Sequence, residues 1–247
     1  MKLQPAENYS FLTQSERSTK IDGVDDLSDF KETKLALKDL GFSQDSQNAI
    51  FDALKAVIHM GNITFEANTA NTECNIKRGD SANMMGAAAQ LLGLQAHRLQ
   101  MCLIQRTMTV RGETLHVALD VDQAIQTRNA FAKEIYGRLF SHIVHQINEA
   151  LQPKGSGGND IKRTSSDLCI GLLDIFGFEI FEHNSFEQLC INYANEKLQQ
   201  YFIHYVLKKE QEVYASEELD IQEIAPRDNE DVLRLIESKP QGLLTRL

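Results

Sequence analysis

The 247-residue sequence lacks the long apolar runs and the paired cysteines that define several classes of protein. No apolar run approaches the ~18 residues that cross a membrane, and the first residues, MKLQPAENYS, show no signal peptide. The four cysteines form no C-x-x-C pair, so no metal site is indicated, and reduced thiols favour the cytosol. Cys169 and Cys190 occupy apolar periodic positions and are predicted to be small core residues.

Positive charge is also scarce. The formal net charge is -10, which excludes a nucleic-acid binder of the electrostatic kind. Hydrophobic residues make up 42% of the chain and charged residues 24%, as in ordinary globular proteins. The length suits one large domain or two small ones, so a sizeable core is expected.

Motifs for three common enzyme sites are missing. The phosphate-binding pattern G-x-x-x-x-G-K-[ST] does not occur, and its nearest candidate, Gly157 to Lys162, has Ile161 in place of the second glycine. His142 and His145 share a helix face without a third ligand, so we expect solvated residues rather than a zinc site. No serine stands in a nucleophile elbow.

Helical periodicity dominates what is present. Helices are predicted from Ser28, as the cap, to Gly41, over the stretch SQDSQNAIFDALKAVIHMGN ending at Gly61, over 81–94, and over 122–151. The last has an apolar stripe that needs a large partner surface. The stretch 107–119 alternates around RGE and predicts two strands with an exposed turn; ITF predicts a short strand, and 66–80 a polar surface loop.

The stretch LCIGLLDIF is apolar on both faces, which predicts a strand buried within a sheet. Asp174 lies near its end, followed by Gly177 and Glu179. Phosphoryl-transfer enzymes hold magnesium with an acid at this place, and a nearby glycine lets a backbone N–H approach the terminal phosphate. The alternative is an ordinary buried strand that ends in a glycine turn with surface acids.

A long helix is predicted next, from Ser185 to Tyr214. Gln188, three residues after Ser185, completes a capping box. Two apolar stripes follow, and the step between Tyr193 and Leu198 is out of phase. A helix with such a slip bends there or faces different partners at its two ends.

The segment LLDIFGFEIFEHNSFEQLCINYANEKLQQYF (172–202) closely resembles the switch II and relay-helix segment of myosin motor domains. Further landmarks of that family follow in order along nearly the whole chain: YSFLTQS, AVIHMGNITFE (56–66), QTRNAFAKEIYGRLFSHIVHQIN (126–148) and LIESKPQGLL (235–244). The resemblance implies an α/β, mostly α fold, part of a P-loop NTPase-type motor with long helices around a central sheet strand.

Three regions are implied by the resemblance. Residues 1–151 would belong to the upper lobe with its actin-contacting loop, 152–167 would be a flexible loop, and 168–247 would hold the switch II strand, relay helix and relay loop. The family places a tryptophan and, five residues later, a phenylalanine in the relay loop. This chain has Ile221 and Pro226 there, and no tryptophan anywhere.

Roles for single residues are carried over from the family. Asp174 would hold Mg²⁺ through water, the N–H of Gly177 would meet the γ-phosphate of ATP, and Glu179 would pair with a switch I arginine. Phe186, Asn195 and Phe202 would belong to the relay helix. The actin-contacting turn would comprise the residues Arg111, Gly112, Glu113 and Thr114.

The implied function is an actin-based cytoskeletal motor that couples ATP hydrolysis to force. Partners would be actin filaments, the remainder of the heavy chain, and light chains or calmodulin through other segments, with a location at the actin cytoskeleton in a myosin complex. The P-loop and switch I are not found, so we expect the chain alone to be an inactive ATPase. The alternatives are a non-catalytic actin-binding fragment and a pseudo-motor.

Overall fold

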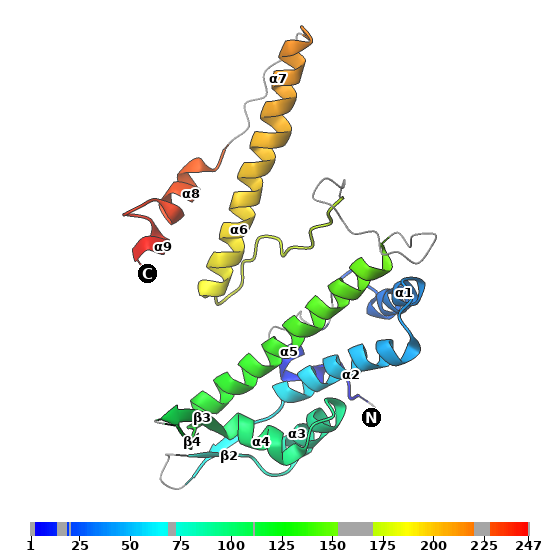
Figure 1. The fold of residues 1–247 in the computed structure, drawn as a ribbon, viewed down its shortest axis with the longest axis vertical. Coiled ribbons are helices and arrows are strands. Elements are labelled where there is room, and N and C mark those ends of the chain that lie inside the picture. The colour runs from blue at the N-terminus through cyan, green and yellow to red at the C-terminus, as the bar shows by residue number, and fades with distance from the viewer. Residues whose placement is uncertain are drawn as a thin grey trace. The chain divides into compact units, whose positions relative to one another are not determined.

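The computed structural model describes residues 3–13, 19, 21–68, 73–110, 112–152, 170–219 and 228–246. They belong to two compact units, Met1–Lys162 and Arg163–Leu247. The division falls within the predicted loop at 152–167, nearly all of which lies outside the described residues. The described chain is mostly helical, as predicted, and its strands pair only as two separate hairpins (Figure 1). No described helix is long and apolar enough to cross a membrane.

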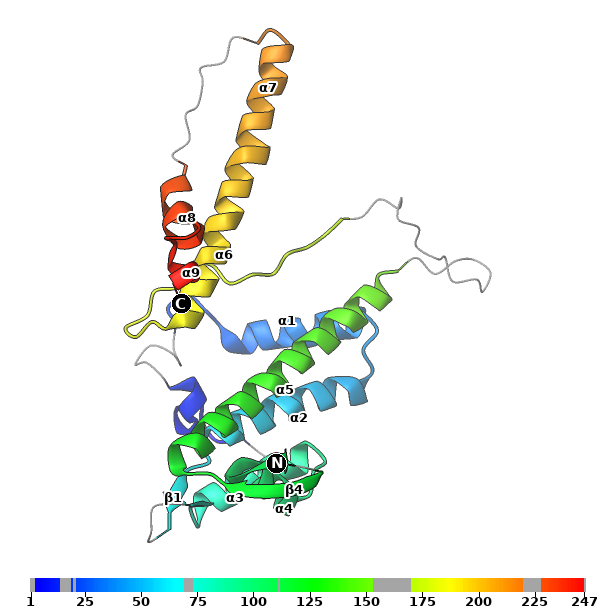
Figure 2. The ribbon, with the colours of Figure 1, turned by 60° about the vertical axis from the view of Figure 1, so that its left-hand side comes forward.

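The first unit is built on two long helices that lie side by side, α2 (Gln44–Gly61) and α5 (Val121–Ala150) (Figures 1 and 2). Helices α1 (Asp26–Asp39), α3 (Asp80–Leu91) and α4 (Ala96–Ile104) complete it, with two short 3-10 turns, η1 (Ala6–Asn8) and η2 (Ser10–Leu12). The core includes the buried side chains Ala56, Met60, Ile63, Ala88, Leu99, Leu103, Leu119 and Ala124.

The end of α2 is closed by the N-terminal segment. A Cβ at Gly61 would lie 2.7 Å from Cγ of Phe11, so only glycine permits this approach. The carbonyl of Gly61 accepts hydrogen bonds from Oγ of Ser10 at 2.6 Å and from Nη1 of Arg128 at 3.2 Å. Arg128 also donates to the carbonyl of Ile63 at 2.6 Å. These bonds satisfy carbonyl groups that a helix end leaves without partners.

Two hairpins flank these helices. Strands β1 (Phe65–Ala67) and β2 (Cys74–Ile76) pair antiparallel, as do β3 (Gln105–Val110) and β4 (Glu113–Ala118). The second hairpin confirms the prediction for 107–119. The predicted surface loop at 66–80 is wrong in part: it contains β2, where Cys74 and Ile76 are buried and the N–H of Cys74 donates to the carbonyl of Leu119 at 3.0 Å.

Two further corrections concern helix positions. The cap of α1 is Asp25 rather than Ser28, because its side chain accepts hydrogen bonds from the N–H groups of Leu27 and Ser28. Helix α4 was not predicted, since it is short and runs directly into β3. The end at Gly41 is confirmed, with φ of +87° just after the helix.

The second unit is dominated by one helical rod. It comprises α6 (Phe186–Phe202), a π-helical segment η3 (Ile203–Lys208) and α7 (Lys209–Ser216) (Figure 1). The long helix predicted from Ser185 is thus confirmed, and the irregularity lies just beyond the predicted phase slip. Helix α8 (Glu230–Glu237) lies beside α6 in both views, and a short α9 (Leu243–Arg246) follows (Figure 2).

The buried strand predicted for LCIGLLDIF (168–176) is wrong over its described part. Residues 170–185 contain neither helix nor strand, and Leu172 is 97% exposed. A buried strand needs neighbours for its N–H and C=O groups, and the described residues of this unit contain no strand that could pair with it. Cys190 is exposed, so its predicted core position is also wrong, while Cys169 and the relay-loop positions Ile221 and Pro226 lie outside the described residues.

Candidate functional site

The predicted site residues Asp174, Gly177 and Glu179 lie on the stretch that leads into α6. We call residues 174–184 the switch segment. Asp174 and Gly177 are exposed, and Glu179 is half-buried. The segment has no regular structure of its own, so what holds it must come from its neighbours.

Two side-chain amides of α6 hold the switch segment. Asn192 Oδ1 accepts a hydrogen bond from the N–H of Glu179 at 2.7 Å, and its Nδ2 donates to the carbonyl of Glu179 at 2.8 Å. Asn195 Nδ2 donates to the carbonyl of Phe176 at 3.0 Å and to that of Ile191 at 2.9 Å. Asn192 and Asn195 are three residues apart and therefore share a helix face.

The bond from Asn195 acts on the peptide group of Gly177. The carbonyl of Phe176 and the N–H of Gly177 belong to one planar trans unit, so they point in opposite directions. Anchoring the oxygen on α6 therefore directs the Gly177 N–H away from Asn195. A rotation of this peptide would either break the hydrogen bond to Asn195 or move Asn195 and the helix with it.

Glycine is not required at position 177 by the chain itself. A Cβ there would meet nothing within 4 Å, and φ does not lie in the left-handed region. Any need for glycine must therefore arise from something that approaches the open side of the peptide.

A second pair of bonds closes the turn before α6. Asn184 Oδ1 accepts from the N–H of Phe181 at 3.0 Å, and Nδ2 of Asn184 donates to the carbonyl of Phe181 at 2.8 Å. Ser185 and Gln188 form the predicted capping box, with Gln188 Oε1 2.8 Å from the N–H of Ser185. The switch segment thus enters the helix through a fixed turn.

The three predicted relay residues, Phe186, Asn195 and Phe202, differ in their surroundings. Asn195 contacts the switch segment, whereas Phe186 and Phe202 are 58% and 51% exposed.

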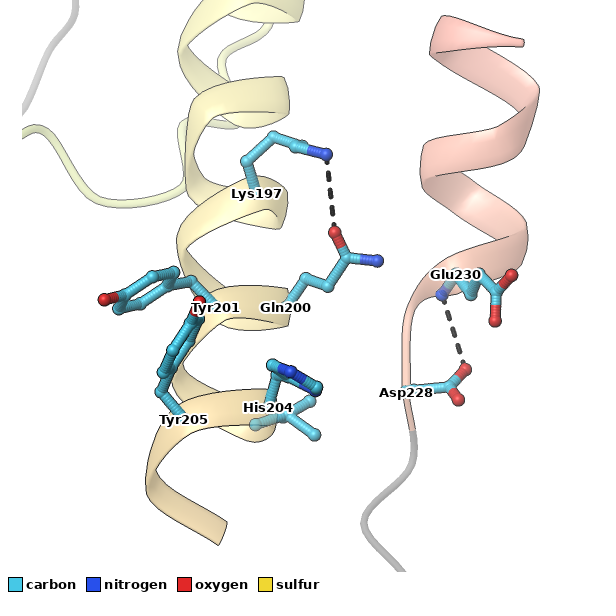
Figure 3. A pocket seen from close by; sticks show the side chains of 8 residues that line it. Lys197, Gln200, Tyr201, His204, Tyr205, Asp228 and Glu230 are labelled. Atoms are coloured by element: carbon cyan, nitrogen blue, oxygen red, sulfur yellow. Dashed lines mark hydrogen bonds between the residues drawn. The ribbon is translucent and has the colours of Figure 1, made fainter. Parts of the chain in front are cut away.

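Further along the rod, an open groove of about 370 Å³ lies between the helix and the start of α8. Gln200 and His204 extend toward Asp228 and Glu230 there (Figure 3). None of the predicted site residues lines this groove.

The predicted actin-contacting residues lie at an exposed hairpin tip. Gly112, with φ of +85°, makes the turn, and Glu113 and Thr114 begin β4 opposite Val110 and Thr109. Glu113 and Thr114 are both exposed. Arg111 lies outside the described residues.

The resemblance to myosin motor domains would place an aspartate at position 129, where this chain has Asn129. Its Oδ1 accepts hydrogen bonds from Nε and Nη2 of Arg128 at 3.0 and 2.8 Å. The side-chain amide of Asn129 thus offers an oxygen acceptor, as an aspartate would, but it carries no negative charge. The guanidinium also lies over the ring of Phe11, at 5.6 Å from its centroid.

Among the residues that the structure describes, histidines and acids do not gather into a metal site. In the described part of the chain, no group of three or more His, Cys, Asp and Glu side chains could hold a metal ion. His142 and His145 are exposed, as predicted, and Nε2 of His145 lies 3.4 Å from Glu149.

Asn192 is the contact that sequence reasoning missed. It makes two hydrogen bonds to the switch segment, at 2.7 and 2.8 Å, whereas Asn195 makes one, at 3.0 Å. The signal was its position three residues before Asn195, on the same helix face.

Residues 1–247 match the family described as Myosin head (motor domain). The chain is 43% identical over 246 residues to Myosin-5 of Arabidopsis thaliana. It is 38% identical to both Myosin-I heavy chain of Dictyostelium discoideum and Unconventional myosin-Ic-A of Xenopus laevis. The alignments cover 100%, 100% and 98% of this chain but only 16%, 10% and 23% of those proteins. The chain therefore spans less than a quarter of the length of each of these relatives.

Proposed function

The chain belongs to the myosin head (motor domain) family, and we propose that it supplies switch II, the relay helix and an actin-contacting hairpin to an actin-based motor. The switch segment corresponds to switch II, and the rod of α6, η3 and α7 to the relay helix. In the complete protein, ATP hydrolysis would be coupled to force on actin filaments at the cytoskeleton.

One observation carries the proposal: the hydrogen bond from Asn195 to the carbonyl of Phe176, at 3.0 Å. It attaches the peptide whose N–H belongs to Gly177 to the helix. A movement of that peptide would therefore displace α6 through Asn195. Because α6 continues through η3 into α7, a small shift at one end of the rod can reach the other.

The residues present fit only part of a nucleotide site. Asp174 offers an exposed carboxylate, which suits Mg²⁺ through water, and the exposed Gly177 carries a backbone N–H, a group that suits a phosphate oxygen. No described residues form a phosphate cradle around them. The chain alone should therefore not hydrolyse ATP, and the remaining contacts would come from other parts of the motor.

The hairpin supports the actin-binding part of the proposal. Glu113 lies 16 residues before Asn129, at the place where the family carries an acidic or phosphorylatable residue. Its carboxylate is exposed beside the turn at Gly112. A permanent acid there would support strong actin engagement without a kinase.

The test uses the complete protein that contains this chain. We expect Mg²⁺-dependent ATPase activity that actin filaments stimulate. Asn195→Ala should leave ATP binding intact but lower actin gliding several-fold, because the Gly177 peptide would no longer be attached to α6. Asn184→Ala is the matched control, since it removes an amide of the same segment that does not bond to that peptide.

Each outcome separates the proposal from its alternatives. Actin binding without hydrolysis by the complete protein would favour the non-catalytic fragment or the pseudo-motor. Equal gliding by Asn195→Ala and Asn184→Ala would show that the 176–177 peptide is not the coupled element.

A further inference from the structure

A carboxylate of α8 bridges two residues of α6. Glu237 accepts a hydrogen bond from the hydroxyl of Tyr193 through Oε2, and its Oε1 lies 3.2 Å from Nζ of Lys197. Tyr193 and Lys197 are four residues apart, so they lie one turn from each other on the same face. One side chain thereby grips a full turn of α6.

The other end of α8 is attached to the same turn. Asn229, the residue before α8, donates from Nδ2 to the carbonyl of Glu196 at 2.8 Å and to the Glu196 carboxylate. Between these two attachments, Leu233 and Ile236 are buried. Helix α8 is therefore fastened at both ends and in its middle.

The electrostatics of the bridge agree with its geometry. Hydrogen bonds from Tyr193 and from Lys197 lower the pKa of Glu237, and the bond to Glu237 raises the pKa of Tyr193. The carboxylate is thus held charged and the phenol protonated. Both states favour the contact near neutral pH.

The attachments of α8 all lie on the same turns of α6 that bond to the switch segment. Tyr193, Glu196 and Lys197 fall between or beside Asn192 and Asn195, which hold the switch segment. Beyond them begins η3, a π-helical segment of a kind that is rare and usually confined to a single turn within an α-helix. The rod is therefore braced where it meets the switch segment and less regular where the brace ends.

We propose that Glu237 is a positioning residue that clamps α8 onto the first half of the relay helix, so that α6 and α8 move as one body when the switch segment moves. When the switch segment moves, it displaces Asn192 and Asn195. The contacts with α8 keep α6 from deforming locally around Tyr193, so the whole helix moves. The mechanical meaning of the clamp rests on the proposed motor function, but the clamp itself does not.

Hydrogen exchange on the complete protein tests the clamp without reference to motor activity. In Glu237→Gln the side chain keeps its shape and loses its charge, so the amides of α8 and of residues 193–202 should exchange a few-fold faster, the effect expected for an exposed ion pair. Glu230→Gln is the matched control, because Glu230 pairs with Arg234 within α8 itself, at 2.8 Å. Equal exchange in the two variants would overturn the clamp.

A double-mutant cycle isolates the contact. If the phenol acts through Glu237, Tyr193→Phe should speed exchange in the wild-type background and add little in Glu237→Gln. Glu237→Asp, which keeps the charge on a shorter stem, should restore part of the protection. Full additivity of Tyr193→Phe and Glu237→Gln would count against the bridge.

A coupling measurement then tests the mechanical role. Glu237→Gln should lower the gliding distance per ATP hydrolysed several-fold while hydrolysis without actin stays within about twofold of wild type. Faster exchange with unchanged gliding would make α8 a purely structural support and overturn the positioning role. A wild-type protein without actin-activated hydrolysis would instead refute the proposed function, while the exchange result would still decide the clamp.

Discussion

The two units of the chain differ in how their apolar side chains are covered. In the first, helices from distant parts of the sequence enclose side chains such as Ala56, Met60 and Leu103, each fully buried. In the described second unit only Ile203, Leu233 and Ile236 are buried apolar residues, and Leu172 and Ile170 are 97% and 95% exposed. The first unit is thus held by a core, and the second by a few hydrogen bonds to a helix.

The difference shows that apolar sequence does not by itself say what covers it. The run around Leu172 is as apolar as any stretch of the first unit, yet no described element of its own unit packs over it. A segment of this kind gains little stability from its own unit. Instead it presents backbone groups that the amides of Asn192 and Asn195 can position.

The largest expected effect contrasts two leucines. Leu103→Ala, in the core of the first unit, should lower the free energy of unfolding by about 2–5 kcal/mol, because it removes fully buried methyl groups and leaves a cavity. Leu172→Ala should change it by less than about 0.5 kcal/mol. Urea unfolding followed by hydrogen exchange of each unit gives both values. Equal losses would erase the distinction between the units.

The next effect concerns Gly177 in the complete protein. Gly177→Ala should slow single-turnover hydrolysis roughly 100- to 1,000-fold, the usual effect of losing one backbone donor to a developing charge, while ATP binding persists. The added methyl meets nothing within 4 Å in this chain, so exchange at the switch segment should not change. Near wild-type hydrolysis would mean that Gly177 does not contact the phosphate.

A smaller effect compares the two capping boxes. Asp120→Ala at α5 and Ser185→Ala at α6 each remove a cap worth about 1 kcal/mol. Exchange should rise only in the first turn of α5, where the core holds the rest. In α6, which has no buried residue, it should rise along several turns. Similar patterns in both helices would contradict the difference in support.

The smallest effect is a pH dependence confined to the first unit. His59 is 1% exposed, against Tyr9 and Met84, and burial lowers its pKa below the ordinary 6.5. The unfolded chain therefore binds the proton more readily. Stability is complete above pH 6.5 and declines as the pH falls toward the lowered pKa.

The urea concentration at the unfolding midpoint of the first unit should therefore decrease as the pH is lowered from 7.5 to 5.5. His59→Phe, which cannot be protonated, should reduce that dependence. His142→Phe, at an exposed site, should leave it unchanged. A dependence that persists in His59→Phe would assign it to other groups.

Much of the local structure was predictable because its causes lie within a few residues. The apolar spacing of α2 and α5, the Ser185–Gln188 box and the turn at Gly112 are all short-range signals. Asn195 was identified by resemblance, and its contact with Phe176 agrees with that position. Its role in coupling stays a prediction.

By itself, the sequence determined where helices and turns form and which family the chain resembles, because periodicity, caps and motifs are local properties. Only the tertiary structure decided that Cys74 is buried, that residues 170–175 are not, and that Asn192 and Glu237 make contacts. Each of these depends on which group lies opposite in space. Burial requires a covering surface and a hydrogen bond requires a partner, and neither is encoded at the position it concerns.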